Sequence, residues 1–268
     1  MNNQALLDVI QQAADEKKTV LHLFNEGLTT LPPELFELTH LKELGLSGNQ
    51  LTTLPRQLAN LSQLKVLYLS DNQLTTLPPA ICQLRQLKVL YLSNNQLNRL
   101  PFQMARLSRR LEGLYLNGNL FTVLPRVITK LSQLRLLILN DNHLLTLPPE
   151  IGNLSQLEIL YLNNNQLKAL PPEIVKLSRL KRLYLNDNQL TRLPFAFYKL
   201  SELEKLTLFE NPLPIHLDLL KQVNEPAKII HFLNRQMLKQ RMVQENRQDF
   251  LVNLLEGLLL ILLMLLIL

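Results

Sequence analysis

The apolar residues of this chain recur with one long period. Around each repeat the chain reads LxxLxxLxLxxNxLxxLPxxIxx, and the asparagines in this pattern follow one another at 23 residues, with a single step of 24. These asparagines are Asn49, Asn72, Asn95, Asn119, Asn142, Asn165, Asn188 and Asn211. Complete units begin at Leu38, Leu61, Leu84, Leu107, Leu131, Leu154 and Leu177. A degenerate unit near Asp15 and a truncated one from Leu200 extend the prediction to about nine units.

Each unit carries the pattern of a short strand followed by an arc. The LxL segment alternates buried and exposed positions, which is the period of a strand. We expect the proline of the LPxxIxx segment to end the strand. One unit cannot bury its leucines alone, but stacked units can, so a continuous leucine core along a coil is predicted. The asparagines offer a donor and an acceptor to backbone groups that the turn after each strand leaves unpaired, and we call this predicted series the asparagine ladder.

This pattern resembles that of the leucine-rich repeat proteins over roughly residues 20–213. The resemblance implies an α/β fold, a leucine-rich repeat solenoid curved into a horseshoe with a parallel sheet on its concave face. Nine strands about 4.8 Å apart would give a sheet roughly 40 Å long. The LP-containing unit is similar to the cytosolic Ras-group repeats and to the repeat array of bacterial Roco proteins. Roco proteins continue into a GTPase domain with a phosphate loop, and this sequence ends without one.

Helical caps are expected at both ends of the array, because an end unit exposes a row of leucines. Residues 1–18 are predicted to form the first cap; the alternative is a membrane or partner-binding helix. Its apolar face comprises Leu6, Ile10, Ala13 and Ala14. Residues 19–214 form the predicted solenoid, and residues 215–248 a basic cap whose helix starts near Pro226. The apolar stripe of this second cap comprises Ile229, Ile230, Leu233, Met237 and Leu238.

Two columns of side chains are predicted to face the concave surface. The residues between the two leucines of LxL are His22, Gly45, Tyr68, Tyr91, Tyr115, Ile138, Tyr161, Tyr184 and Thr207. The residues before the first of those leucines are Glu43, Val66, Val89, Gly113, Leu136, Ile159, Arg182 and Lys205. The middle of this face is aliphatic and aromatic, which is typical of a partner site, and its far end is basic. The alternative is that the tyrosines only stack on one another and were copied with the repeat.

The neighbouring column is predicted to serve the turns and not a ligand. It comprises Ser47, Ser70, Ser93, Asn117, Asn140, Asn163 and Asn186. Asp71, Asp141 and Asp187 precede ladder asparagines, where a short polar residue suits a turn, and their spacing of a unit or more makes a catalytic pair a poor fit.

Composition argues against an enzyme. Leucine accounts for 73 of the 268 residues and glycine for only 7, and no glycine spacing forms a phosphate-binding loop. The histidines are scattered, no nucleophile has a base beside it, and no metal or cofactor site is expected. Cys82 is predicted to be a packing residue, and with a single cysteine and no secretory signal the chain is expected on the cytosolic side and not outside the cell.

The net charge of +6 is densest beside an apolar tail. Residues 221–247 hold six Lys or Arg against two Glu, a net charge of +4, and residues 249–268 form a hydrophobic tail. A helix over residues 250–268 would be about 28 Å long, close to the thickness of a bilayer core, if Glu256 is tolerated. Three interpretations stay open: a membrane anchor, a helix buried against a partner or another copy, and a truncated or frame-shifted end. Nucleic-acid binding is not expected, because no aromatic residues interleave with the charge.

These features predict a non-enzymatic interaction scaffold that binds a protein partner on its concave face and is held at a membrane by its tail. No small-molecule substrate is expected. The family resemblance implies a small GTPase or its regulator as the partner. The alternative is a regulatory repeat fragment of a multidomain Roco-type GTPase or kinase whose catalytic domain is absent from this chain.

Overall fold

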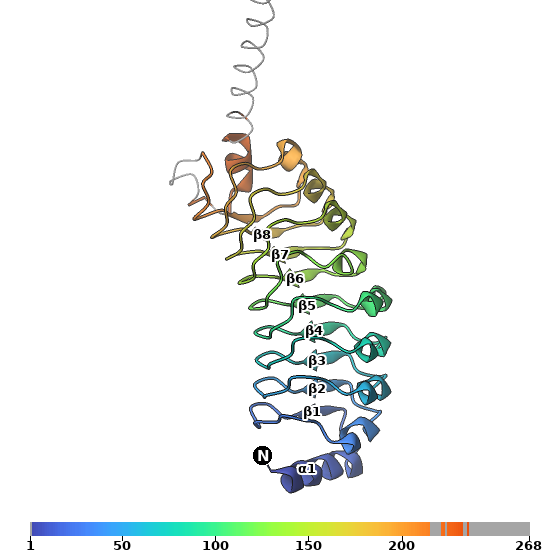
Figure 1. Cartoon of the computed structure of the whole chain (residues 1–268). Helices are drawn as coiled ribbons and strands as arrows, with labels where there is room; N and C mark the ends of the chain where they lie inside the picture. Colours follow the sequence, from blue (N-terminus) through green and yellow to red (C-terminus); the bar gives the residue numbers. More distant parts are fainter. Residues whose placement is uncertain (1, 215–220, 223, 233–234, 236–268) are drawn as a thin grey trace, which may run out of the picture.

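Nine short strands and eight 3-10 helices alternate along the described part of the chain. The computed structural model describes residues 2–214, 221–222, 224–232 and 235. The units stack along one axis in chain order, with the strands and the 3-10 helices in two separate rows (Figure 1). The strands are β1 (Val20–His22), β2 (Glu43–Gly45), β3 (Val66–Tyr68), β4 (Val89–Tyr91), β5 (Gly113–Tyr115), β6 (Leu136–Ile138), β7 (Ile159–Tyr161), β8 (Arg182–Tyr184) and β9 (Lys205–Thr207).

The strands form one parallel, open sheet in the order of the sequence, as the repeat predicts. The central leucine of each strand pairs with the central leucine of the next, as Leu67 does with Leu90. These leucines are buried, because the arcs close over one face of the sheet. The extra residue at 108–110 leaves this register intact, since Leu90 still pairs with Leu114. The insertion therefore leaves the stack of strands unbroken.

The arcs opposite the sheet contain 3-10 helices. They are η1 (Pro33–Glu37), η2 (Arg56–Asn60), η3 (Pro79–Gln83), η4 (Phe102–Leu107), η5 (Ile128–Lys130), η6 (Pro149–Asn153), η7 (Pro172–Lys176) and η8 (Phe195–Lys199). The prediction that the prolines end the strands is wrong. Strand β3 ends at Tyr68, whereas Pro78 is the N-cap of η3 on the far side of the unit. Proline suits that place because its fixed φ is compatible with a helix start and no N–H is needed there.

The asparagine ladder ties each unit to the one before it, as predicted. Asn142 is 4% exposed, and its Oδ1 accepts a hydrogen bond from the backbone N–H of Phe121 at 3.1 Å. Its Nδ2 donates to the carbonyl of Leu116 at 3.0 Å in the preceding unit and to that of Leu139 at 3.2 Å in its own. The same bonds recur around Asn72. The ladder thus satisfies buried backbone groups that no strand or helix pairs.

The residue before each ladder asparagine turns the chain with a left-handed backbone. These residues have φ between 52° and 72° and are Gly48, Asp71, Asn94, Gly118, Asp141, Asn164, Asp187 and Glu210. Asn and Asp tolerate this conformation better than other non-glycine residues. The predicted turn role of Asp71, Asp141 and Asp187 is confirmed.

A helix covers the first unit. Helix α1 (Asn3–Asp15) begins at the N-cap Asn2, whose Oδ1 accepts from the backbone N–H of Ala5 at 2.8 Å. It buries Leu6, Ile10 and Ala13, three residues of the face expected of a cap. At the other end, residues 226–232 are helical, and Ile229 and Ile230 are buried.

Several predictions concern residues that the structure does not describe. Leu233, Met237 and Leu238 of the second cap and the whole tail, residues 249–268, lie outside the described residues. Within the described ranges, no helix combines the length and the apolar character needed to cross a membrane.

Candidate functional site

The face of the sheet that the arcs do not cover, which we call the outer face, presents two columns of side chains. We call the residues at the third position of each strand, from His22 on β1 to Thr207 on β9, the tyrosine file. We call those at the first position, from Val20 to Lys205, the entry column. In β3, β4, β6 and β7 the outer residues are half-buried on either side of a buried leucine. The structure therefore brings the two predicted columns together on one face.

The tyrosines of the file form two stacks. The ring centroids of Tyr68 and Tyr91 are 4.6 Å apart, and those of Tyr91 and Tyr115 are 4.2 Å apart. Ile138 separates this stack from Tyr161 and Tyr184, whose centroids are 4.1 Å apart with an interplanar angle of 2°. The stacking that the alternative interpretation expected is thus confirmed. It does not compete with binding, because the rings keep one face or edge half-exposed.

The first stack extends to the N-terminal end of the sheet through a residue that the sequence analysis missed. The ring of Phe24 covers Gly45, and a Cβ atom at that glycine would lie 2.5 Å from it. Phe24 stacks on His22 at 4.7 Å and meets Tyr68 edge-on at 5.7 Å. The signal was present in the sequence, since a phenylalanine stands where the next seven units have serine or asparagine, beside the one glycine of the file.

Burial within the stacks raises the pKa of three tyrosines of the file. Burial, together with a hydrogen bond to Tyr91, raises the pKa of Tyr115 to about 12. Burial is also the main cause that raises the pKa of Tyr161, with a further contribution from the side chain of Tyr184. Burial and the carboxylate of Glu43 raise the pKa of Tyr68. The file therefore presents neutral hydroxyls on an apolar surface at physiological pH.

The C-terminal end of the face is cationic. Arg182 of β8 and Lys205 of β9 pair in register in the entry column. The ammonium of Lys205 lies 5.6 Å from the ring centroid of Tyr184. The hydroxyl of Thr207 is buried and has no hydrogen-bond partner among the described residues. The predicted change from an apolar to a basic surface thus coincides with the last two strands.

The serine and asparagine column beside the file serves the backbone, as predicted. Oδ1 of Asn140 accepts from the backbone N–H of Asn163 at 2.8 Å, and Oδ1 of Asn163 accepts from that of Asn186 at 2.8 Å. Oγ of Ser93 donates to Oδ1 of Asn117 at 2.6 Å. These side chains are committed to bonds between units.

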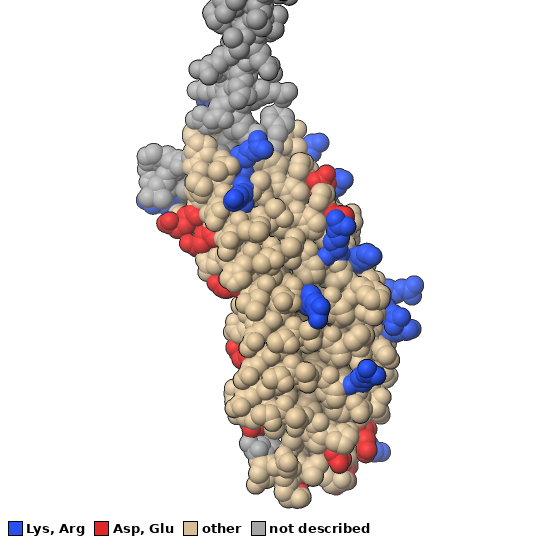
Figure 2. Space-filling view, in the orientation of Figure 1, with Lys and Arg blue, Asp and Glu red and all other residues tan. Residues whose placement is uncertain are grey.

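Uncharged side chains cover most of the side of the solenoid seen in Figure 2, and most Lys and Arg in that view lie toward its right-hand edge. Where charged residues precede the strands, several pair between units. Lys88 lies 3.2 Å from Glu112, and Arg135 lies 2.6 Å from Glu158. Such exposed pairs contribute little to stability.

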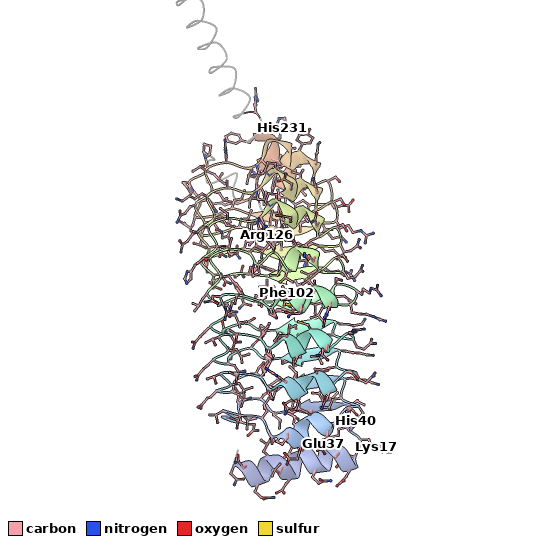
Figure 3. The ribbon with its side chains drawn as sticks, turned by 45° about the vertical axis from the view of Figure 1, so that its right-hand side comes forward. Lys17, Glu37, His40, Phe102, Arg126 and His231 are labelled. Carbon is pink, nitrogen blue, oxygen red and sulfur yellow. The ribbon has the colours of Figure 1, made fainter. Side chains whose placement is uncertain are left out.

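Titratable side chains elsewhere are dispersed. Figure 3 shows His40 near Glu37 and Lys17 by α1, Phe102 and Arg126 on the 3-10 helix side, and His231 at the far end. Among the described residues no group of three His, Cys, Asp or Glu side chains could hold a metal ion. Cys82 is fully buried, and burial raises the pKa of its thiol to about 11, so its predicted packing role is confirmed.

Three solved structures of repeat proteins resemble this fold. The leucine-rich repeat domain of the type III effector XopL matches with a TM-score of 0.70 and 29% identity, over 79% of this chain and 76% of that chain. Internalin C2 from Listeria monocytogenes matches with a TM-score of 0.64 and 28% identity, over 78% and 92%. The ectodomain of the receptor kinase GASSHO1/SCHENGEN3 from Arabidopsis thaliana, in complex with CASPARIAN STRIP INTEGRITY FACTOR 2, matches with a TM-score of 0.61 and 34% identity over 69% of this chain.

This chain spans 23% of the length of the plant ectodomain. No curated protein matches it in sequence. The family model described as a leucine-rich repeat region matches residues 25–119 and 119–261. Because these matches cover most of the sequence and the fold agrees with them, the chain belongs to the leucine-rich repeat proteins.

Proposed function

We propose that this chain is a non-catalytic interaction scaffold that binds a peptide or protein partner on the outer face of its sheet. One observation carries the proposal: half-buried aromatic and aliphatic side chains stand in register along the tyrosine file and the entry column, on a sheet whose other face is closed. A contiguous apolar surface of this kind marks a partner site. The repeat fold itself typically serves as an interaction module.

The tyrosines suit this role because they are already ordered. Tyr91 lies between the rings of Tyr68 and Tyr115, so a partner would not have to immobilise it. Binding to a preorganised surface loses less side-chain entropy than binding to mobile groups. Each tyrosine also combines a large apolar area with a hydroxyl that can accept or donate a hydrogen bond.

The plant ectodomain supports the binding of a partner, because that repeat structure was solved in complex with a factor. The resemblance covers only part of the plant protein, so its receptor function is not transferred to this chain. For a first protein partner we propose a small GTPase or its regulator, the class associated with Ras-group repeats. Binding of purified GTPases, loaded with GDP or a GTP analogue, to the immobilised chain tests that choice.

The binding face is tested with a random peptide library displayed on phage and selected on the wild-type chain. Replacing Tyr91, Tyr115 and Tyr161 together by Ala should abolish capture of the selected peptides and leave the circular dichroism spectrum unchanged. The matched control removes two exposed aromatic rings elsewhere, Phe102→Ala and Tyr198→Ala, which are 79% and 54% exposed. Equal capture by both variants would refute a binding site on this face.

We also propose that residues 250–268 hold the scaffold at a membrane, with the basic residues before them on the cytosolic side. The support is the sequence alone: a nearly uninterrupted apolar run follows a segment of net charge +4. Cells that express the full chain and a chain without residues 257–268 should differ on fractionation. A full-length protein that stays in the soluble fraction excludes the anchor.

The 23-residue LP unit also supports a second candidate, a regulatory repeat fragment of a Roco-type GTPase or kinase. The two candidates differ in what is encoded beside the gene. A neighbouring open reading frame that contains GxxxxGK[ST] favours the fragment, and its absence favours the independent scaffold.

A further inference from the structure

The entry column ends in two cations that lack an acidic partner. Arg182 and Lys205 are register partners on neighbouring parallel strands, so their Cα atoms lie about 4.8 Å apart. Arg182 is exposed and Lys205 is half-buried. Neither forms an ion pair with any residue that the structure describes. Like charges side by side on a sheet are unfavourable, so this pair is not explained by the stability of the fold.

Several other charged side chains near the strands are matched. His22 lies 3.0 Å from Glu43, Lys88 pairs with Glu112, and Arg135 pairs with Glu158. The carboxylate of Glu158, one unit before Arg182, receives two hydrogen bonds from Arg135. Glu204 precedes Lys205 directly, and neighbouring residues of an extended segment project in different directions. The two cations therefore keep free donors on the outer face.

The surface beside these cations is apolar and flat. Tyr161 and Tyr184 stack in parallel, and the ammonium of Lys205 lies over the ring of Tyr184. Apolar surroundings strengthen hydrogen bonds between charged groups. Both cations also act electrostatically on Tyr161, which shows that they share one surface with the second tyrosine stack.

We propose that Arg182 and Lys205 form a carboxylate-binding subsite that receives an acidic side chain or the C-terminal carboxylate of a bound peptide. This inference rests on the proposed function. The planar guanidinium of arginine matches a carboxylate with two parallel hydrogen bonds, and the lysine ammonium supplies a third donor. A phosphate is the poorer match, because phosphate sites recruit backbone N–H groups, and here the sheet uses those groups.

The subsite also determines how a bound peptide is positioned. Five strand steps separate Tyr91 on β4 from Lys205 on β9, which is about 24 Å at the spacing of a sheet. An extended peptide covers that distance with about seven residues. A peptide that crosses the strands is therefore expected to carry its acid about seven residues from the apolar side chain that contacts the first tyrosine stack.

The test uses the peptides selected on the wild-type chain, from one library with free C-termini and one with the random segment followed by a fixed sequence. If Asp or Glu is enriched in the second library, the carboxylate comes from an acidic side chain. If binders are selected from the first library alone, it comes from the C-terminus of the peptide. The double variant Arg182→Gln, Lys205→Gln should weaken binding by about tenfold or more. The matched control, Lys42→Gln with Lys65→Gln, removes the same charge from two exposed lysines and should change binding less than about twofold.

A peptide in which the acidic group is replaced by the corresponding amide completes a double-mutant cycle with the double variant. The replacement should weaken binding to the wild-type chain and have no further effect on the double variant. Peptides that need the tyrosines but bind equally with and without the acid overturn the subsite and leave the proposed function intact. If no selected peptide depends on the tyrosines, both the proposed function and the subsite fail.

Discussion

Replacing one ladder asparagine tests what holds the units of the solenoid together. In Asn142→Ala the backbone N–H of Phe121 loses its only side-chain acceptor and stays buried. The carbonyls of Leu116 and Leu139 are less affected, because each also accepts a bond from another ladder asparagine, Asn119 and Asn165 respectively. The acceptor atom Oδ1 is therefore the part of Asn142 that no neighbour replaces.

The magnitude follows from that difference. A buried N–H without a partner costs about 1–3 kcal/mol, and the loss of shared bonds to the carbonyls adds about 1 kcal/mol. We expect Asn142→Ala to lower the free energy of unfolding by about 2–4 kcal/mol. Asn98→Ala is the matched control, since Asn98 is exposed and makes no side-chain hydrogen bond to any described residue. It should cost less than about 0.5 kcal/mol.

Urea denaturation followed by far-ultraviolet circular dichroism measures both variants against the wild type. A variant Asn142→Asp adds a pH readout, because its carboxyl would be buried facing carbonyl groups, which raises its pKa. The folded state then holds its proton above the pH at which the unfolded state releases it, so this variant should lose stability as pH rises from about 4 to 7. If Asn142→Ala costs no more than Asn98→Ala, the ladder does not stabilise the stack.

Three further outcomes follow from the site. Because burial raises the pKa of Cys82 to about 11, its thiol should not react with a disulfide reagent at pH 8 until urea unfolds the chain, and reaction in the folded state would contradict the packing role. The pKa of Tyr115 is raised from 10.0 to about 12, so the unfolding free energy should fall as pH rises between those values, and Tyr115→Phe should reduce that fall in urea titrations at pH 9 and 11. Gly45→Ala should cost about 1 kcal/mol, because its Cβ would meet the ring of Phe24, and Phe24→Ala should relieve most of that cost; an unchanged cost would place the strain elsewhere.

The repeat made much of the fold predictable because each unit must bury the same leucine positions against its neighbours. The strands, their parallel order and the register of leucine on leucine follow from one alternation and one period. The asparagine ladder was predictable for the same reason, since a polar residue at a fixed place in a leucine core needs backbone partners. The role of the prolines was not, because the pattern fixes their place in the unit without showing where each strand ends.

The candidate site was also predictable only in part. The order of residues in the tyrosine file could be read directly, but the cover of Gly45 by Phe24 required the distance between a ring and a neighbouring strand. The lack of a partner for Arg182 and Lys205 likewise depends on where Arg135 directs its guanidinium, onto Glu158. A sequence states which charges exist, and only the folded chain decides which of them neutralise one another.

The sequence by itself determined the repeat, the sheet and the two columns of its outer face, because a 23-residue period with alternating leucines can bury its apolar side chains in only one kind of stack. The tertiary structure decided how the copies differ. Ile138 divides the tyrosines into two stacks, Phe24 extends the first of them, and two cations beside the second form no ion pair with a described residue. The physical reason is distance: residues one period apart in the chain become neighbours about 4.8 Å apart in the sheet, where their contacts are set by side-chain shape and charge and no longer by the repeat.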